Sequence, residues 1–309
     1  MTGGLAAVTG ATGFLGQHLV RALIDDGWRV RILSRRDPIS PFWAGLTPEV
    51  VPGDLADSQA VARLCRGADL VVHAAGLIGG NDTDLQRVNV DGVRQVAIAA
   101  RSGHFVHVSS LVAREPALSA YAASKRAGEV AATQAFGAGA TVIRPPAIYG
   151  PGDRETLRLF TLAARGPALP VLAPESRIAL VHVQDAARQI VHLARARRAG
   201  TVALSDAQPQ GYGWREIMQT AAQAFSRNIP LVRVPDAALY FGAATDTFAN
   251  RWRGRRAVFT FGKVKELTHL DWGVPAEERA ADGPMPEFGL PAGFAHTIGW
   301  YRSQGWLSA

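Results

Sequence analysis

The sequence has little cysteine and no long hydrophobic run, and these absences exclude several classes of protein. Cys65 is the only cysteine among the 309 residues, which excludes an internal disulfide and a cysteine-based zinc site. No stretch of about 18 consecutive apolar residues occurs, so no membrane span is predicted. The N-terminus lacks a basic segment followed by a long apolar stretch. We therefore predict no secretory signal, and the cytoplasm is the expected location.

Lysine is also scarce, so arginine supplies most of the positive charge. The formal net charge is +7, yet Lys125, Lys263 and Lys265 are the only lysines. A basic balance can indicate nucleic-acid binding. The arginines are scattered, however, with one denser group at positions 251, 253, 255 and 256. We interpret them as a solvated surface and predict no nucleic-acid partner.

The first 150 residues alternate short apolar runs with helical patterns. Helical spacing predicts helices over 14–26 and about 85–101. This alternation is typical of a parallel sheet with helices on both faces. After Gly150 prolines break the rhythm, and one more strand–helix–strand pattern follows over 178–204. The strands predicted before Gly150 are 5–8, 30–33, 50–51, 70–72, 105–108 and 141–143.

A glycine-rich loop follows the first predicted strand. The segment T-G-A-T-G-F-L-G (9–16) places Gly10, Gly13 and Gly16 between that strand and a helix. Glycine allows a tight turn and lets the backbone approach a phosphate closely. The free N–H groups at the start of the helix, with the positive end of its dipole, favour a pyrophosphate. Strand, loop and helix thus occur in the order that a dinucleotide site requires.

The fold class follows from this loop and the alternating pattern. We predict an α/β fold, a doubly wound parallel Rossmann sheet with a smaller, discontinuous, α-rich substrate domain. Residues 1–150, completed by about 178–204, are predicted to form the NAD(P)-binding domain. Residues 151–177 and 205–309 are predicted to form the substrate-binding domain.

The residues after the second predicted strand favour NADP over NAD. An NAD site commonly has a carboxylate there, which binds the ribose 2′-hydroxyl. This sequence has Ser34, Arg35 and Arg36 instead, and guanidinium groups match the 2′-phosphate of NADP. Asp54, after the third strand, is placed to bind the adenine amino group. A role in the turn before Leu55 is the alternative.

Tyr121 and Lys125 stand four residues apart in Y-A-A-S-K, so on a helix they share one face. A nearby ammonium favours the phenolate and so lowers the pKa of the phenol. Such a phenol can exchange a proton with a carbonyl oxygen near neutral pH. With the glycine loop, the pair predicts hydride chemistry on a small-molecule substrate that has a hydroxyl or carbonyl group.

Taken in order, these motifs resemble the short-chain dehydrogenase/reductase superfamily, in its extended or atypical branch of NAD(P)-dependent epimerase/dehydratase-like proteins. The resemblance covers residues 5–187. Ser110 and Tyr121 are only eleven residues apart, which is similar to complex I accessory subunits and to steroid- or flavonoid-type reductases. The further matching segments are G-D-L (53–55), H-A-A-G (73–76), N-V-D-G (89–92), V-S-S (108–110), R-P-P-A-I-Y-G (144–150) and V-H-V-Q-D-A-A (181–187).

The resemblance implies roles for four catalytic residues. Tyr121 is the general acid/base, and Lys125 lowers its pKa and binds the nicotinamide ribose. Ser110 holds the substrate oxygen, with Ser109 as the alternative because one residue of register decides between them. Asn89 supports the active-site helix and a water relay to the lysine. The cofactor-binding candidates are Gly10, Thr12, Gly13, Phe14, Leu15, Gly16, Ser34, Arg35, Arg36, Asp54, Leu55, Ala74, Ala75, Gly76, Tyr121, Lys125, Pro145 and Ile148.

Three functions stay open at this point. The first is an NAD(P)-dependent oxidoreductase of a secondary alcohol or ketone. The others are a sugar or sugar-nucleotide epimerase and a non-catalytic NADPH-binding scaffold or sensor like the complex I accessory subunits. No metal is predicted, because His73, His107 and His182 lack paired metal-ligand spacing. The family also implies a homodimer as an alternative to a monomer, through helices over 85–101 and 120–136.

The substrate domain is rich in aromatic and arginine residues, which indicates an apolar pocket with a basic rim. The segment 237–252 has the pattern of an amphipathic helix, and we expect its apolar side to pack on the domain. The candidate pocket residues are Phe160, Trp214, Tyr240, Phe241, Phe248, Arg251, Trp252, Phe259 and Phe261.

Overall fold

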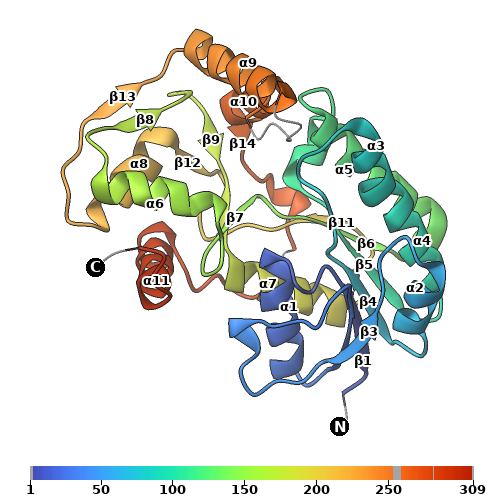
Figure 1. The fold of residues 1–309 in the computed structure, drawn as a ribbon. Helices are drawn as coiled ribbons and strands as arrows, with labels where there is room; N and C mark the ends of the chain where they lie inside the picture. The colour runs from blue at the N-terminus through green and yellow to red at the C-terminus, as the bar shows by residue number, and fades with distance from the viewer. Residues whose placement is uncertain (1–2, 253–258, 281, 308–309) are drawn as a thin grey trace. The chain divides into compact units, whose positions relative to one another are not determined.

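The structure, a computed structural model, describes residues 3–252, 259–280 and 282–307 (Figure 1). The predicted basic group at 253, 255 and 256 lies outside these residues. The chain divides into two compact units. Unit 1 consists of Met1–Pro145, Ala187–Ala203 and Ala280–Pro284, and unit 2 of Pro146–Ala186, Leu204–Arg279 and Met285–Ala309.

Unit 1 is built on a parallel sheet of seven strands in the order β11-β6-β5-β4-β1-β2-β3. Strands β2 and β3 lie on one side of β1, and the later strands β4, β5, β6 and β11 lie on the other side. This change of side at β1 is the arrangement of a doubly wound dinucleotide-binding sheet. The predicted α/β fold class is therefore confirmed. The strands are β1 (Leu5–Thr9), β2 (Arg29–Ser34), β3 (Glu49–Pro52), β4 (Leu70–His73), β5 (His104–Val108), β6 (Thr141–Arg144) and β11 (Gly200–Ala203).

Helices cover both faces of this sheet (Figure 1). On one face, apolar side chains of α2, α4 and α5 pack on the strands in one core, in which Leu64, Val96 and Phe105 are buried. On the other face lie α1 and the part of α7 from Ala187 onward, joined where Arg195 donates hydrogen bonds to Asp26. The helices are α1 (Phe14–Asp25), α2 (Ser58–Cys65), α3 (Asp82–Gln86), α4 (Gly92–Ala99), α5 (Ala120–Phe136) and α7 (Val183–Arg195), with short turns η1 (Pro41–Trp43) and η3 (Leu111–Arg114).

The helix predicted over 85–101 is interrupted by a wider turn. A π-helical segment, η2 (Arg87–Asp91), separates α3 from α4 and contains the buried Asn89. One extra residue per turn changes the direction of the side chains on either side of it, and such turns are frequent at functional sites. Apolar periodicity alone predicts a regular helix here, so the sequence did not reveal the turn.

Unit 2 takes in part of the chain that the sequence assigned to the first domain. Residues 178–186 belong to unit 2, because β10 pairs with β7 and not with the seven-stranded sheet. Its strands are β7 (Ala147–Tyr149), β8 (Leu169–Val171), β9 (Arg177–Ile178), β10 (Leu180–His182), β12 (Tyr212–Gly213), β13 (Leu231–Arg233) and β14 (Asp271–Trp272). Its helices are α6 (Glu155–Arg165), α8 (Trp214–Gln223), α9 (Asp236–Trp252), α10 (Phe261–Thr268), η4 (Ala276–Glu278) and α11 (Leu290–Ser303).

An aromatic core holds unit 2 together. Phe160 packs edge-on against Phe294, and Tyr149 packs edge-on against the same ring. All three side chains are buried. Phe160 is therefore a core residue, which corrects its expected place in the lining of a pocket.

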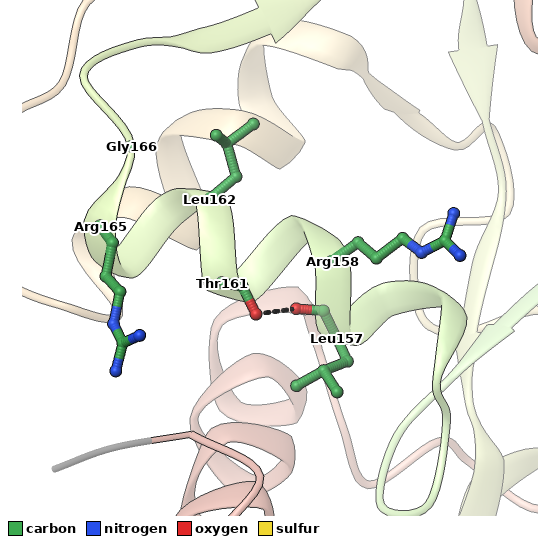
Figure 2. Close-up of a pocket in the computed structure, with 6 residues that line it drawn as sticks. All are labelled: Leu157, Arg158, Thr161, Leu162, Arg165 and Gly166. Carbon is green, nitrogen blue, oxygen red and sulfur yellow. Dashed lines mark hydrogen bonds between the residues drawn. The ribbon is translucent and has the colours of Figure 1, made fainter.

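A shallow groove of about 470 Å³ lies along the outer side of α6 (Figure 2). Leu157 and Leu162 supply apolar surface, and the Arg158 and Arg165 side chains extend away from the helix on either side. The Thr161 hydroxyl donates to the carbonyl oxygen of Leu157 at 2.8 Å. None of the predicted cofactor or catalytic residues lines this groove.

No helix among the described residues has the length and apolar character needed to cross a bilayer.

Candidate active site

The glycine loop brings three chain segments close together in unit 1. Gly10 has φ of +70°, and a side chain there would strike the backbone of Ala74 and Ala75 after β4. Gly16, in the first turn of α1, would overlap the carbonyl oxygen of Gly10 if it had a Cβ. Gly13 donates its N–H to that same oxygen at 2.9 Å. The three glycines thus leave backbone without side chains at the closest approaches of the loop to α1 and to the loop after β4, which fits a pyrophosphate.

The residues predicted to bind the 2′-phosphate lie at the end of β2, and Asp54, predicted to bind the adenine amino group, follows β3. Arg35 is 81 % exposed, and its Nε lies 3.7 Å from Oδ2 of Asp54. The Ser34 hydroxyl donates to the carbonyl oxygen of Arg36 at 2.6 Å, which shapes the loop that follows β2. Asp54 accepts a hydrogen bond from Ala56 N–H at 3.0 Å, so its carboxylate also takes part in a turn.

Lys125 is buried on α5, with its ammonium turned to the ends of two strands. Nζ donates to the carbonyl oxygen of Val108, at the end of β5, at 2.9 Å. A Cβ on Gly76, in the loop after β4, would lie 3.7 Å from Nζ. Burial lowers the pKa of Lys125 to about 8, while Glu129 acts in the opposite direction. Tyr121 is half-buried one helical turn earlier, on the same face of α5.

Asn89 ties the loop after β4 to helix α5. Its side-chain oxygen accepts from Leu77 N–H at 2.8 Å, and its amide donates to the carbonyl oxygen of Leu77 at 2.8 Å. The same amide donates to the hydroxyl of Ser124 at 2.9 Å, and that hydroxyl donates to the carbonyl oxygen of Tyr121 at 2.8 Å. Asn89 therefore fixes the first turn of α5, which carries Tyr121.

Ser109 and Ser110 are adjacent but have different surroundings. Ser109 is buried, and its hydroxyl donates to Oε1 of Glu129 at 2.7 Å. Ser110 is half-buried, and its hydroxyl accepts only a long hydrogen bond of 3.4 Å from Val112 N–H. The loop is fixed to β6 because Ser109 N–H donates to Ile143 and Leu111 N–H donates to Pro145. Of the two hydroxyls, the one on Ser110 is better placed to contact a ligand.

Glu129 is a site residue that the sequence reasoning missed. Besides Ser109, its carboxylate accepts two hydrogen bonds from Arg144, at 2.8 and 2.7 Å, and one from Arg126 at 3.0 Å. Tyr121, Lys125 and Glu129 are spaced at successive intervals of four, so they follow one face of α5. The position of a carboxylate four residues after Lys125 could have indicated from the sequence that Glu129 lies near the ammonium. Its buried charge is matched by the Arg144 guanidinium, at the end of β6.

Two buried histidines lie beneath this site, at the ends of β4 and β5. The rings of His73 and His107 stack with their centroids 5.6 Å apart. Nδ1 of His73 shares a hydrogen bond of 2.8 Å with the Thr9 hydroxyl. Burial, with a smaller contribution from Lys125, lowers the pKa of His73 to about 3 and that of His107 well below its usual value. Both imidazoles are therefore neutral at physiological pH.

The predicted residues in unit 1 therefore meet at the carboxyl ends of the parallel strands. The glycine loop follows β1, Gly76 follows β4, Ser110 follows β5 and the buried Pro145 follows β6. In doubly wound sheets, nucleotide ligands bind at this edge. Ile148 lies in β7, within unit 2, and is half-buried. The arrangement in unit 1 can hold a dinucleotide near a phenol and a buried ammonium. These groups are suited to hydride transfer coupled to proton transfer.

This fold and site define an NAD(P)-dependent enzyme of the Rossmann type. The NAD dependent epimerase/dehydratase family model matches residues 6–203, and the chain belongs to that family. It is 52 % identical over 308 residues to a protein of Caulobacter vibrioides named ceramide reductase, covering 98 % of this chain and 96 % of the relative.

Solved structures share the fold at lower identity. The crystal structure of gox2253 aligns with a TM-score of 0.76 at 22 % identity, over 97 % of this chain and 98 % of that one. MoeE5, solved in complex with UDP-glucose and NAD, aligns with a TM-score of 0.68 at 20 % identity, over 98 % and 99 %. The family to which the chain belongs makes a nicotinamide dinucleotide the cofactor class.

Proposed function

We propose that this protein is an NADP-dependent reductase that converts a ketone on a ceramide-type lipid to a secondary alcohol. The observation that carries the proposal is the match to the ceramide reductase over nearly the full length of both chains. Because that match extends beyond the glycine loop, it includes the segments of unit 2 that are expected to contact the substrate. The short segment between Ser110 and Tyr121 also favours a reductase over a sugar-nucleotide enzyme.

The side chains of unit 1 suit this reaction. A reduced nicotinamide, if bound beside these residues, would supply the hydride. Tyr121 donates its phenolic proton to the carbonyl oxygen, so the ketone gains one hydride and one proton. Ser110 donates a hydrogen bond to the same oxygen and holds it beside the phenol. Lys125 stabilises the phenolate that remains, since a neighbouring positive charge favours the ionised form. Asn89 keeps α5 in position.

The cofactor proposal is NADP in preference to NAD. Arg35 and Arg36 directly follow β2, and Arg35 is exposed. No acidic residue stands at positions 34 to 36, where a carboxylate would repel a phosphate. The carboxylate of Asp54 forms an ion pair with Arg35, with 3.7 Å between Oδ2 and Nε, and this pair can orient the guanidinium. A guanidinium can bind a 2′-phosphate through two parallel hydrogen bonds. The backbone of the glycine loop would hold the pyrophosphate.

Turnover by wild type and by Tyr121→Phe tests the proposal. Wild type should oxidise NADPH when given a ceramide-type ketone in detergent, and mass spectrometry should detect a product heavier by two hydrogens. Tyr121→Phe should retain NADPH binding, because the glycine loop, Arg35 and Lys125 remain even though one candidate contact at the phenol is removed. Its turnover should fall at least about a hundredfold, the usual contribution of a positioned acid.

Two results would contradict the proposal. One is a Tyr121→Phe variant with wild-type turnover, which would remove the phenol from the chemistry. The other is a wild type that leaves the lipid ketone unchanged but inverts a hydroxyl of a UDP-sugar with no net NADPH consumption. That second result would establish the epimerase alternative. Tight NADPH binding with no reaction in either assay would favour a cofactor-binding scaffold.

A further inference from the structure

Helix α9 has an exposed aromatic face in addition to its packed one. Among the residues that the structure describes, the most exposed aromatic side chains are Phe241, Phe248 and Phe261, at 71, 67 and 48 %. The first two lie seven residues apart on α9, two turns along the same face. Ala237 and Thr245 are exposed on this face as well. The face thus carries aromatic and small side chains and no charge between 237 and 245.

The opposite side of α9 accounts for the packing within unit 2. Leu239 and Ala243 are buried against Val264 of α10. Asp246 is turned to this inner side, where its carboxylate accepts hydrogen bonds from Phe259 N–H at 2.9 Å and from the Asn250 amide at 2.8 Å. The amphipathic helix expected over 237–252 therefore does pack on its domain through one side. Phe241 and Phe248 lie on the other side and are exposed, which corrects their expected place in the lining of a pocket.

The third exposed ring extends the face onto α10. Phe261 begins α10, and its ring stacks on Tyr240 of α9 with the centroids 6.0 Å apart. Three exposed aromatic rings on two adjoining helices form a larger apolar surface than the isolated exposed residues that are normal on a soluble protein. We call Phe241, Phe248 and Phe261, with the small residues between them, the α9 face.

Positive charge stands beside the α9 face. Arg233 is exposed three residues before α9 begins, and Lys265 is exposed on α10. The chain as a whole carries a formal net charge of +7. Aromatic residues on a helix next to basic ones are the features of segments that lie in the interface of an anionic bilayer. A second copy of this basic chain would be repelled by the same charge.

We propose that the α9 face binds the surface of an anionic lipid bilayer, with the phenylalanine rings inserted among the lipid headgroups. The proposal rests on the proposed function, because a ceramide-type ketone resides in a bilayer and not in water. An enzyme attached to that bilayer meets its substrate at the surface where the substrate is dissolved. The attachment uses unit 2, whereas the proton-transfer residues belong to unit 1.

Vesicle binding tests the proposal without cofactor or substrate. The full chain is sedimented with vesicles of equal parts phosphatidylglycerol and phosphatidylcholine, and with vesicles of phosphatidylcholine alone. The variant Phe241→Ser with Phe248→Ser is compared with Met285→Ser, whose methionine is 87 % exposed in unit 2 outside α9 and α10. Circular dichroism verifies that both variants are folded, as expected for changes to exposed side chains.

We expect wild type and Met285→Ser to bind the anionic vesicles equally, and the double variant to bind them at least about tenfold more weakly. Raising the salt concentration should weaken binding by wild type. Equal binding by wild type and the double variant would overturn the proposal, as would failure of wild type to bind. A wild-type dimer that the double variant converts to a monomer would also overturn it, because the face would then join two copies.

The outcome is separable from that of the proposed function. In detergent, turnover of the lipid ketone by the double variant should stay within about a factor of two of wild type, because no bilayer is present. Vesicle binding without any reduction of the ketone supports the α9 face and contradicts the proposed substrate. Reduction of the ketone in detergent without vesicle binding contradicts the α9 face and leaves the proposed substrate intact.

Discussion

Acidification should destabilise the protein through His73, and the size of the effect follows from its surroundings. In the unfolded chain the imidazole has its ordinary pKa of 6.5, whereas in the folded protein burial lowers the pKa to about 3. Between these values the unfolded chain binds a proton that the folded protein does not. The free energy of unfolding therefore falls as the pH falls below about 6.5. From about pH 7.5 to 5.5, this single group removes about 1.4 kcal/mol.

The comparison of wild type with His73→Gln isolates this contribution. Glutamine does not titrate, and its amide can replace the hydrogen bond to Thr9. Asp206 has the opposite sign and acts equally in both proteins, whereas His107 has the same sign and owes a smaller part of its lowered pKa to His73 itself. Burial raises the pKa of Asp206 to about 6, so its carboxyl gains a proton in the folded protein first. Urea unfolding at the two pH values should show a loss smaller by about 1.4 kcal/mol in the variant.

The result that refutes this reasoning is the same loss of stability in both proteins. It would mean that the His73 imidazole takes up its proton in the folded state, and hence that water or a counter-charge reaches the strand ends. A variant that is less stable at both pH values by an equal amount gives this same refuting result, with a loss of packing by the ring added to it. That outcome is distinguished from the predicted one because it leaves the slope with pH unchanged.

Three further changes test other parts of the site. Glu129→Gln should move the alkaline fall of kcat/KM to lower pH, since Glu129 raises the Lys125 pKa of about 8 and the ammonium is lost sooner without it; an unmoved limb contradicts this. Gly16→Ala should weaken NADPH binding at least about tenfold in a fluorescence titration, because its Cβ would overlap the Gly10 carbonyl oxygen. Arg35→Ala should weaken NADPH about tenfold more than NADH, and equal losses would remove the argument for phosphate recognition.

Local pattern was enough to predict the sheet and the glycine loop. Each of the six strands predicted before Gly150 overlaps a strand of unit 1, since buried parallel strands appear as short apolar runs between helical segments. The first strand of the pattern predicted over 178–204 exists as β10, but its partner is β7. Which strands pair depends on contacts between segments far apart in the sequence, and apolar periodicity does not contain that information.

Only those residues of the candidate site that belong to recognisable sequence motifs could be predicted. The spacing of Tyr121 and Lys125 placed them on one helical face, and α5 carries both. Ser109 and Ser110 were indistinguishable because the sequence does not fix the direction of either hydroxyl at the strand end. In the structure they differ, because the Ser109 hydroxyl donates a hydrogen bond to the buried carboxylate of Glu129. A buried ion pair such as Glu129 with Arg144 joins a helix to a strand, and neither residue stands out in its own segment.

The wide turn over Arg87–Asp91 sets a limit on how this chain can vary in length. Loss of one residue there would let α3 and α4 join as a regular helix with no strain. The preceding side chains would then rotate by about 100° relative to α4. If the lost residue is Arg87 or Val88, every motif would still be present in the sequence, but the Asn89 amide would no longer reach both Leu77 and Ser124. Relatives that lack one residue in this interval should therefore be inactive, whatever they have conserved elsewhere.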